Sequence, residues 1–311
     1  MSKRIIQTLL MVMVILTIPA CSGSQGMRRA GGRRLVVGYS IVQRDDLVYI
    51  ASNDGFLVYR FNDAENTTKI AEFQADTAFG IFLEEDVVYL ASRNQLITVD
   101  VSDPANPARL SSYRVEGIAF SVLVEGGYAY LVGSEGGIIL DVSDPADPAF
   151  VSRFSEGLEV AGIELSDSTL YVAVPSRGLQ LIDVSDPSLP NLMETVSGTQ
   201  GVENVHVTDQ YLYAACHQQG VKIIEISDSF RPRVIGSFRD DDGGEALAVW
   251  EQDGILYVAD NYQIEALDLE DPANPRQIWE YKQISAAHDL VGDGAYLYIA
   301  AGSFLILEIE L

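Results

Sequence analysis

The sequence predicts an all-β fold, a seven-bladed β-propeller, on three observations. An apolar-Tyr-apolar strand recurs seven times, at spacings of 40, 41, 41, 42, 44 and 41 residues. A turn of the type DVSDPANP follows this strand about a dozen residues later in most copies. No helical 3.6-residue pattern occurs from residue 35 onward. Repeats of 40–44 residues that hold four short strands are typical of propeller blades, which bury their faces against one another.

The recurring strand provides the first marker of each unit. Its central residues are Tyr49, Tyr89, Tyr130, Tyr171, Tyr213, Tyr257 and Tyr298. Regularly spaced aromatic residues in apolar strands are expected to be core residues. The unit at 76–115 predicts four strands, at 79–83, 87–91, 95–101 and 109–115, with turns between them.

The second marker is a proline-containing turn, present at 100–107, 141–148, 183–190, 225–232 and 268–275. Aspartate and serine side chains bond to nearby backbone N–H groups, and proline fixes φ. Asp103, Asp144, Asp186 and Asp271 are therefore predicted to build turns and not to bind ligands.

The segments VDVSDPANP, ILDVSDPADP and LIDVSDPSLP, with YVA-type strands at this spacing, resemble the LVIVD repeat family of bacterial and archaeal cell-surface proteins. The resemblance covers almost all of residues 35–311. It implies a propeller fold and a surface-associated, exported protein. It supplies no catalytic residues.

The first residues predict an export signal and a lipid anchor. Residues 1–20 have two basic residues, an apolar run from Leu9 to Ile18, and then small residues. Ile18-Pro19-Ala20-Cys21 resembles the bacterial lipobox, which implies cleavage before Cys21 and acylation of its thiol. An ordinary secretory signal with a chance cysteine is the alternative. Residues 21–34 read as a flexible basic tether and 35–311 as one propeller domain, on the outer membrane or cell surface.

Closure of the ring is the open point of this organisation. The last unit stops after its third strand, so a fourth is expected from the N-terminal side. Residues 34–39 resemble fourth strands such as 233–238, but they lie close to the first tyrosine strand and are also needed as the inner strand of the first blade. One blade is therefore expected to be incomplete.

Charge and cysteine content exclude some functions. The formal net charge is −25, and the first 34 residues hold six basic and no acidic side chains, so the rest is strongly acidic. Such a body would repel a phosphate backbone, and nucleic acid is not expected as a partner. The acidity suits a salty habitat or a cationic partner equally well. With Cys21 acylated, Cys216 has no internal disulfide partner.

Alignment on the tyrosines predicts which side chains meet at the propeller axis. The inner strands begin at Tyr39, Phe79, Phe120, Ala161, Glu203, Leu247 and His288. The next positions are mostly small: Ser40, Gly80, Ser121, Gly162, Asn204, Ala248 and Asp289. Polar exceptions and nearby loop residues form the candidate binding face: Glu203, Asn204, His217, Asp240, Asp242, Glu245, Tyr262, His288 and Asp289. A carboxylate-rich rim could hold Ca²⁺, but acidic loops are usually solvated, and no cofactor is expected.

These observations favour a membrane-tethered, non-catalytic binding or scaffolding module at the bacterial cell envelope. Its partners would be the bilayer, through acylated Cys21, and an envelope protein, peptide or glycan. No recognised catalytic motif occurs. The alternative is an envelope hydrolase or lyase with a metal or His/Asp site at the channel mouth, which requires His288, Asp289, Glu203 and Glu245 to converge. A third possibility is a mainly structural envelope protein.

Overall fold

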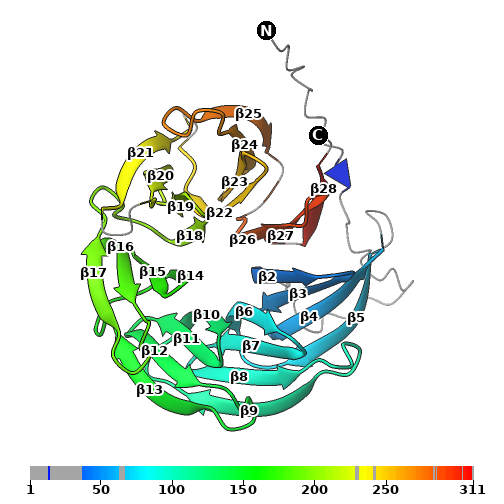
Figure 1. Cartoon of the computed structure of the whole chain (residues 1–311). Coiled ribbons are helices and arrows are strands. Elements are labelled where there is room, and N and C mark those ends of the chain that lie inside the picture. The colour runs from blue at the N-terminus through cyan, green and yellow to red at the C-terminus, as the bar shows by residue number, and fades with distance from the viewer. Residues whose placement is uncertain are drawn as a thin grey trace, which may run out of the picture.

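The computed structural model is a ring of seven antiparallel sheets around a central axis (Figure 1). It describes residues 37–62, 67–227, 231–240, 243–282, 284, 286–302 and 304–309, and the backbone of 13–14. Each sheet has four strands, and within the described residues all regular structure is strand. The innermost strands β2, β6, β10, β14, β18, β22 and β26 surround the axis. The predicted seven-bladed propeller is confirmed.

The first four blades follow the chain in order. Blade 1 is β2 (Gly38–Arg44), β3 (Leu47–Ser52), β4 (Gly55–Phe61) and β5 (Thr67–Gln74). Blade 2 is β6 (Ala78–Glu84), β7 (Val87–Ser92), β8 (Gln95–Asp100) and β9 (Ala108–Arg114), as the unit at 76–115 predicts. Blade 3 is β10 (Ala119–Glu125), β11 (Tyr128–Gly133), β12 (Gly136–Asp141) and β13 (Ala149–Phe154). Blade 4 is β14 (Gly162–Ser166), β15 (Thr169–Val174), β16 (Gly178–Asp183) and β17 (Asn191–Thr195).

The remaining blades continue this order until the last strand. Blade 5 is β18 (Asn204–Val207), β19 (Tyr211–Ala215), β20 (Val221–Glu225) and β21 (Arg233–Phe238). Blade 6 is β22 (Ala246–Gln252), β23 (Ile255–Asp260), β24 (Ile264–Asp268) and β25 (Arg276–Tyr281). Blade 7 is β26 (Asp289–Gly292), β27 (Tyr296–Ala300), β28 (Leu305–Glu308) and β1 (Met13–Val14).

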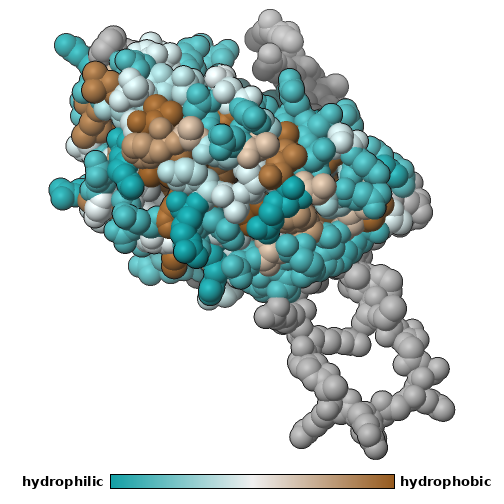
Figure 2. Space-filling model, turned by 90° about the horizontal axis from the view of Figure 1, so that it is seen from below, coloured by the Kyte–Doolittle hydropathy of each residue, from teal (hydrophilic) through white to brown (hydrophobic). Residues whose placement is uncertain are grey.

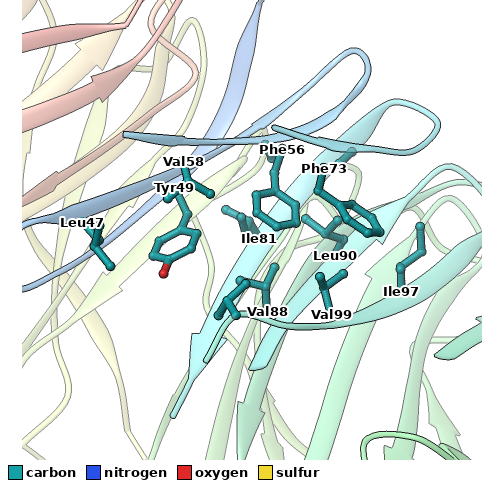
Figure 3. Close-up of a cluster of buried hydrophobic side chains, with 13 residues drawn as sticks. Leu47, Tyr49, Phe56, Val58, Phe73, Ile81, Val88, Leu90, Ile97 and Val99 are labelled. Carbon is teal, nitrogen blue, oxygen red and sulfur yellow. The ribbon is translucent and has the colours of Figure 1, made fainter. Parts of the chain in front are cut away.

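The seven marker tyrosines lie in the second strand of their blades, and each is at most 4 % exposed. Every one belongs to a hydrophobic cluster that joins its own blade to the next. Tyr49 packs with Phe56 of blade 1 and with Ile81 and Leu90 of blade 2 (Figure 3). Tyr298 of blade 7 lies with Ile41 and Ile50 of blade 1, which closes the series. The tyrosines are core residues, as predicted, and their role is to join neighbouring blades.

The proline turns are built by their aspartates, as predicted. Asp103 Oδ1 accepts a hydrogen bond from the Ala105 N–H (3.1 Å), and Asp144, Asp186 and Asp271 repeat this contact. The same turns also reach the preceding blade. The Pro145 carbonyl accepts hydrogen bonds from Thr98 and Ser111 of blade 2, and the Pro187 carbonyl accepts one from Ser152 of blade 3. The repeated turn therefore links blades at the outer rim as well as reversing the chain.

The ring closes differently from the sequence-based expectation. Gly38 and Tyr39 belong to β2, the inner strand of blade 1, so they do not supply the last strand of blade 7. That place is taken by β1, which pairs antiparallel with β28 over two positions, Met13 with Leu307 and Val14 with Ile306. The physical reason is that an inner strand surrounded by two blades buries more surface than an outer clasp. Residues 34–36 lie outside the described part of the chain.

Hydrogen bonds at the axis reinforce the junction between blades 7 and 1. Asp289 Oδ2 accepts hydrogen bonds from the Ser40 hydroxyl (2.9 Å) and the Ile41 N–H (3.1 Å). The Gly38 N–H donates to the Ala301 carbonyl (2.9 Å). The Asp289 contacts join the first and last inner strands, which are more than 240 residues apart in the chain, and the Gly38 contact joins β2 to the end of β27.

Replacement of Asp289 by alanine is expected to weaken this junction, because a buried N–H and a hydroxyl lose their acceptor. Lost hydrogen bonds of this kind cost about 1–3 kcal/mol. Thermal unfolding should show a lower Tm for D289A and a smaller decrease for D289N, which keeps one side-chain oxygen as an acceptor. D147A, at an exposed turn position, is the matched control. Equal Tm values for D289A and D147A would contradict the proposed role of Asp289 in closure.

Candidate functional site

A cavity of about 360 Å³ opens at the axis, where the inner strands begin. All seven predicted entry positions line it: Tyr39, Phe79, Phe120, Ala161, Glu203, Leu247 and His288. Six of the seven adjacent positions line it as well, and Glu159 and Ile163 complete the wall. The axial pocket, as this cavity is called below, is therefore built from one structural position repeated around the ring.

Half of the axial pocket is aromatic. The rings of Tyr39 and Phe79 have centroids 5.2 Å apart, and those of Phe79 and Phe120 are 6.0 Å apart. On the other side of Tyr39, the His288 ring lies at 5.4 Å. The Tyr39 phenol donates a hydrogen bond to Asn53 Oδ1 (2.8 Å), which fixes this ring. Tyr39, Phe79 and Phe120 of blades 1 to 3 thus form one continuous aromatic arc, and His288 of blade 7 lies at its end.

The small residues beside the arc are required by the close approach of the inner strands. A side chain at Gly80 would place its Cβ 2.7 Å from the Phe120 carbonyl oxygen. At Gly162, the same atom would lie 2.7 Å from the Glu203 carbonyl oxygen. These distances are too short for any Cβ, so the axis cannot accept larger residues there without movement of the strands.

Two predicted binding residues, Asn204 and Asp289, hold the strands together. Asn204 Oδ1 accepts a hydrogen bond from the Val249 N–H of blade 6 (3.3 Å), just as Asp289 accepts one from Ile41 of blade 1. Burial raises the pKa of Asp289 to about 6, against the opposing effect of its hydrogen bonds. Both line the axial pocket, but their acceptor atoms already serve the contact between neighbouring inner strands.

The other half of the axial pocket is acidic. Glu203 is half-buried, and its burial raises the pKa of the carboxyl. The charge of His217 opposes this rise, and the charges of Glu159 and Glu245 add to it. Beside it, His217 Nε2 lies 3.2 Å from Glu245 Oε2, and Gln218 donates to Glu245 Oε1 (3.0 Å). The three glutamates come from the links that lead into blades 4, 5 and 6, and His217 and Gln218 come from the turn between β19 and β20 of blade 5.

The remaining predicted residues lie away from the axis. Asp240 joins two buried residues that sequence reasoning missed, Asp260 and Glu265, and one carboxylate oxygen of each lies within 4.8 Å of the others. Asp240 accepts hydrogen bonds from the Gly244 N–H and from Gln263 Nε2, while burial and the Asp240 charge raise the pKa of Asp260. Tyr262 is 67 % exposed. Asp242 lies outside the described residues.

Within the described part of the chain, one group of acidic side chains is close enough together to bind a metal ion. This acidic trio consists of Asp240, Asp260 and Glu265. Carboxylate oxygens suit a hard cation such as Ca²⁺. The hydrolase or lyase alternative requires four other residues to converge, and among the described residues they do not form such a group: His288, Asp289, Glu203 and Glu245.

The Cys216 thiol is fully buried, and burial raises its pKa to about 12. Cys216 is therefore a residue of the hydrophobic core.

In blades 4 to 6, a row of half-buried side chains with polar atoms, Glu164, His206 and Trp250, lies three residues after the entry positions of the inner strands. His206 Nδ1 lies 3.5 Å from Glu164 Oε1, and the His206 ring lies 4.5 Å from that of Trp250. Glu164 Oε2 accepts a hydrogen bond from the Val207 N–H (2.9 Å). Burial lowers the pKa of His206 to about 4 and raises the pKa of Glu164 to about 8, so both are neutral at pH 6. The alignment of inner strands could have revealed this row.

A second hollow of about 340 Å³ lies off the axis, between blades 2 and 3. It is lined by Ile118 and Phe150, which are 46 % and 49 % exposed, together with Arg114 and Arg153. Figure 2 views the rim from the side of these blades and shows apolar patches separated by hydrophilic surface. The lining of this hollow comes from β9, from the link between the two blades and from all four strands of blade 3, so it lacks the repeated geometry of the axial pocket.

Fold and repeat pattern together define a seven-bladed β-propeller repeat protein. The LVIVD repeat model matches residues 77–115, 116–156, 159–197 and 201–240, which is more than half of the chain. The chain belongs to the LVIVD repeat family. A search of curated protein sequences finds no match. Within the described residues, no helix is long and apolar enough to span a bilayer.

Solved propellers share the architecture at low sequence identity. The structure of U3-55K is 9 % identical with a TM-score of 0.72, covering 91 % of this chain and 97 % of that one. The Cps50 (Swd1) β-propeller domain of Myceliophteria thermophila is 10 % identical with a TM-score of 0.72, covering 91 % and 98 %. PorZ, a bacterial surface component of the type-IX secretion system of Porphyromonas gingivalis, is 13 % identical with a TM-score of 0.61, covering 87 % and 36 %. These similarities define the fold alone.

The Glu164–His206 pair predicts a pH-dependent stability. The unfolded chain ionises Glu164 near its ordinary pKa of 4.5, whereas the folded chain keeps it protonated up to about pH 8. The contribution of Glu164 to the free energy of unfolding therefore falls as the pH rises through this interval. Below about pH 6.5 the lowered pKa of His206 has the opposite effect on the total, because there the unfolded chain protonates His206 and the folded chain does not. Relative to wild type, E164Q should gain roughly 2–4 kcal/mol between pH 5 and pH 8. Urea unfolding at both pH values measures this gain, with E156Q, an exposed glutamate, as control. Parallel pH profiles of wild type and E164Q would refute neutral burial of this pair.

Proposed function

We propose that this protein is a membrane-tethered, non-catalytic binding or scaffolding module of the bacterial cell envelope. In this proposal, acylated Cys21 holds the propeller on the outer membrane or cell surface, and an envelope protein, peptide or glycan binds at the axial pocket. No cofactor and no nucleic acid are involved.

The axial pocket is the observation that carries this proposal. Three large aromatic side chains stand half-exposed at the axis, at positions where the other four blades have Ala161, Glu203, Leu247 and His288. Half-exposed aromatic side chains in a concave site are typical of binding surfaces, because they offer large contact area at low entropic cost. One similar propeller belongs to a bacterial surface component, which is compatible with the proposed location.

Replacement of Cys21 by serine tests the tether. Only a cysteine thiol can receive the diacylglyceryl group, so C21S should lose metabolic labelling with a radioactive fatty acid and leave the membrane fraction. C216S is the matched control, since Cys216 lies buried in the core and should keep the label if it folds. A wild-type protein that takes no label yet remains in the membrane fraction would contradict lipid attachment.

Replacement of Phe79 by alanine tests binding at the axial pocket. Wild type, F79A and F150A would be cross-linked in their own cells and purified in detergent, and the bound components compared. Phe150 is the matched control because it is a 49 % exposed phenylalanine away from the axis. We expect a component captured by wild type and F150A to be reduced at least about fivefold with F79A, through loss of a central contact residue. Equal capture by all three would exclude the axial pocket as the binding site.

A further inference from the structure

The axial pocket has two chemically different halves that face each other across the axis. The aromatic arc consists of Tyr39, Phe79 and Phe120, at the starts of β2, β6 and β10. Across from it stand Glu203 and the exposed Glu159, at the entrance to blades 5 and 4. A molecule on the axis therefore meets aromatic rings, tilted 57° and 84° to one another, on one side and carboxylates on the other.

The described residues that line the axial pocket include no lysine or arginine. Burial lowers the pKa of His288, so this ring is neutral at pH 7. The protein as a whole has a net charge of −25. The charge of His217 stabilises the Glu203 carboxylate, but the three carboxylates of Glu159, Glu203 and Glu245 outnumber it. A net negative potential over a pocket attracts cations and disfavours anionic ligands.

Neutral sugars fit the lining less well. A sugar requires paired donors and acceptors, but the Ser40 hydroxyl already donates to Asp289, and Asn204 Oδ1 already accepts from Val249. The carboxylates of Glu203 and Glu159 offer acceptors only. A cation pairs with the carboxylates and the aromatic rings, and it does not need the donors that the lining also holds, the Ser121 hydroxyl and the His288 ring.

We propose that the axial pocket binds the guanidinium group of an arginine presented by a peptide or protein partner; this inference rests on the binding function proposed above. A guanidinium is flat, stacks on aromatic faces and bonds to a carboxylate through two N–H groups. The rings of Tyr39, Phe79 and Phe120 supply the faces, and Glu203 supplies the carboxylate. Partial burial of Glu203 strengthens this pairing, because water screens the charges less there.

Ligand-observed NMR on the full-length protein tests this with two matched probes. Acetyl-Gly-Arg-Gly-amide carries the cation, and acetyl-Gly-citrulline-Gly-amide replaces the guanidinium by a neutral urea of the same shape. The arginine probe should bind at least about tenfold more tightly than the citrulline probe, and its affinity should fall as salt is added. E203Q and F79A should each weaken binding of the arginine probe about tenfold. E116Q and F150A, which make the same changes beside the off-axis hollow, should leave it unchanged.

Three results would overturn the inference: no binding of the arginine probe, equal affinity for both probes, or equal effects of the axial and control variants. Binding of maltohexaose in place of the arginine probe would assign the axial pocket to glycans instead. The capture experiment separates this inference from the broader function. If capture depends on Phe79 but excess arginine probe does not compete, the arginine assignment fails and the binding module stands. If capture does not depend on Phe79, the proposed function fails as well.

Discussion

The structure depends on the packing of one tyrosine per blade against the next blade. A four-stranded sheet of this size has two apolar faces and cannot be stable alone in water. Each marker tyrosine fills the space between two sheets, and each hydrophobic cluster combines residues of two blades. Burial of one such side chain contributes roughly 1.5–3 kcal/mol. Since seven junctions close a ring, a defect at one leaves two sheet faces uncovered.

This packing also fixes the geometry at the axis. Blades held side by side bring their inner strands so close that Gly80 and Gly162 leave no room for a side chain. The preceding position in each strand then points into the axial pocket, and the ring displays one side chain per blade there. The core determines where these seven side chains lie, while their chemistry is free to vary. Aromatic residues occupy blades 1 to 3, and polar or small residues occupy most of the others.

Repetition explains what could be predicted from the sequence and what could not. The strands, the Asp103-type turns and the entry positions of the axis follow from an average over seven copies. Features that occur once are invisible to such an average. Asp260 and Glu265 join Asp240 only because one interblade link folds over blade 6, and Asn204 and Asp289 use their polar atoms for neighbouring strands. The incomplete last repeat called for a fourth strand from the N-terminal side, but β1 does not resemble the repeat, so the pattern did not show which residues form that strand.

The position of β1 bears on how the ring is held closed. Met13 and Val14 lie within the segment predicted to be an export signal, and they pair with β28 at the outer edge of blade 7. The inner contacts of the same junction do not involve them. Tyr298 packs on Ile41 and Ile50, Asp289 bonds to β2, and the Gly38 N–H bonds to Ala301. Burial of the apolar side chains at this junction contributes more to the free energy of unfolding than the two residue pairs between β1 and β28 at the edge of the sheet. Closure therefore rests on the tyrosine junction and the axial hydrogen bonds, and it is compatible with removal of residues 1–20 during export.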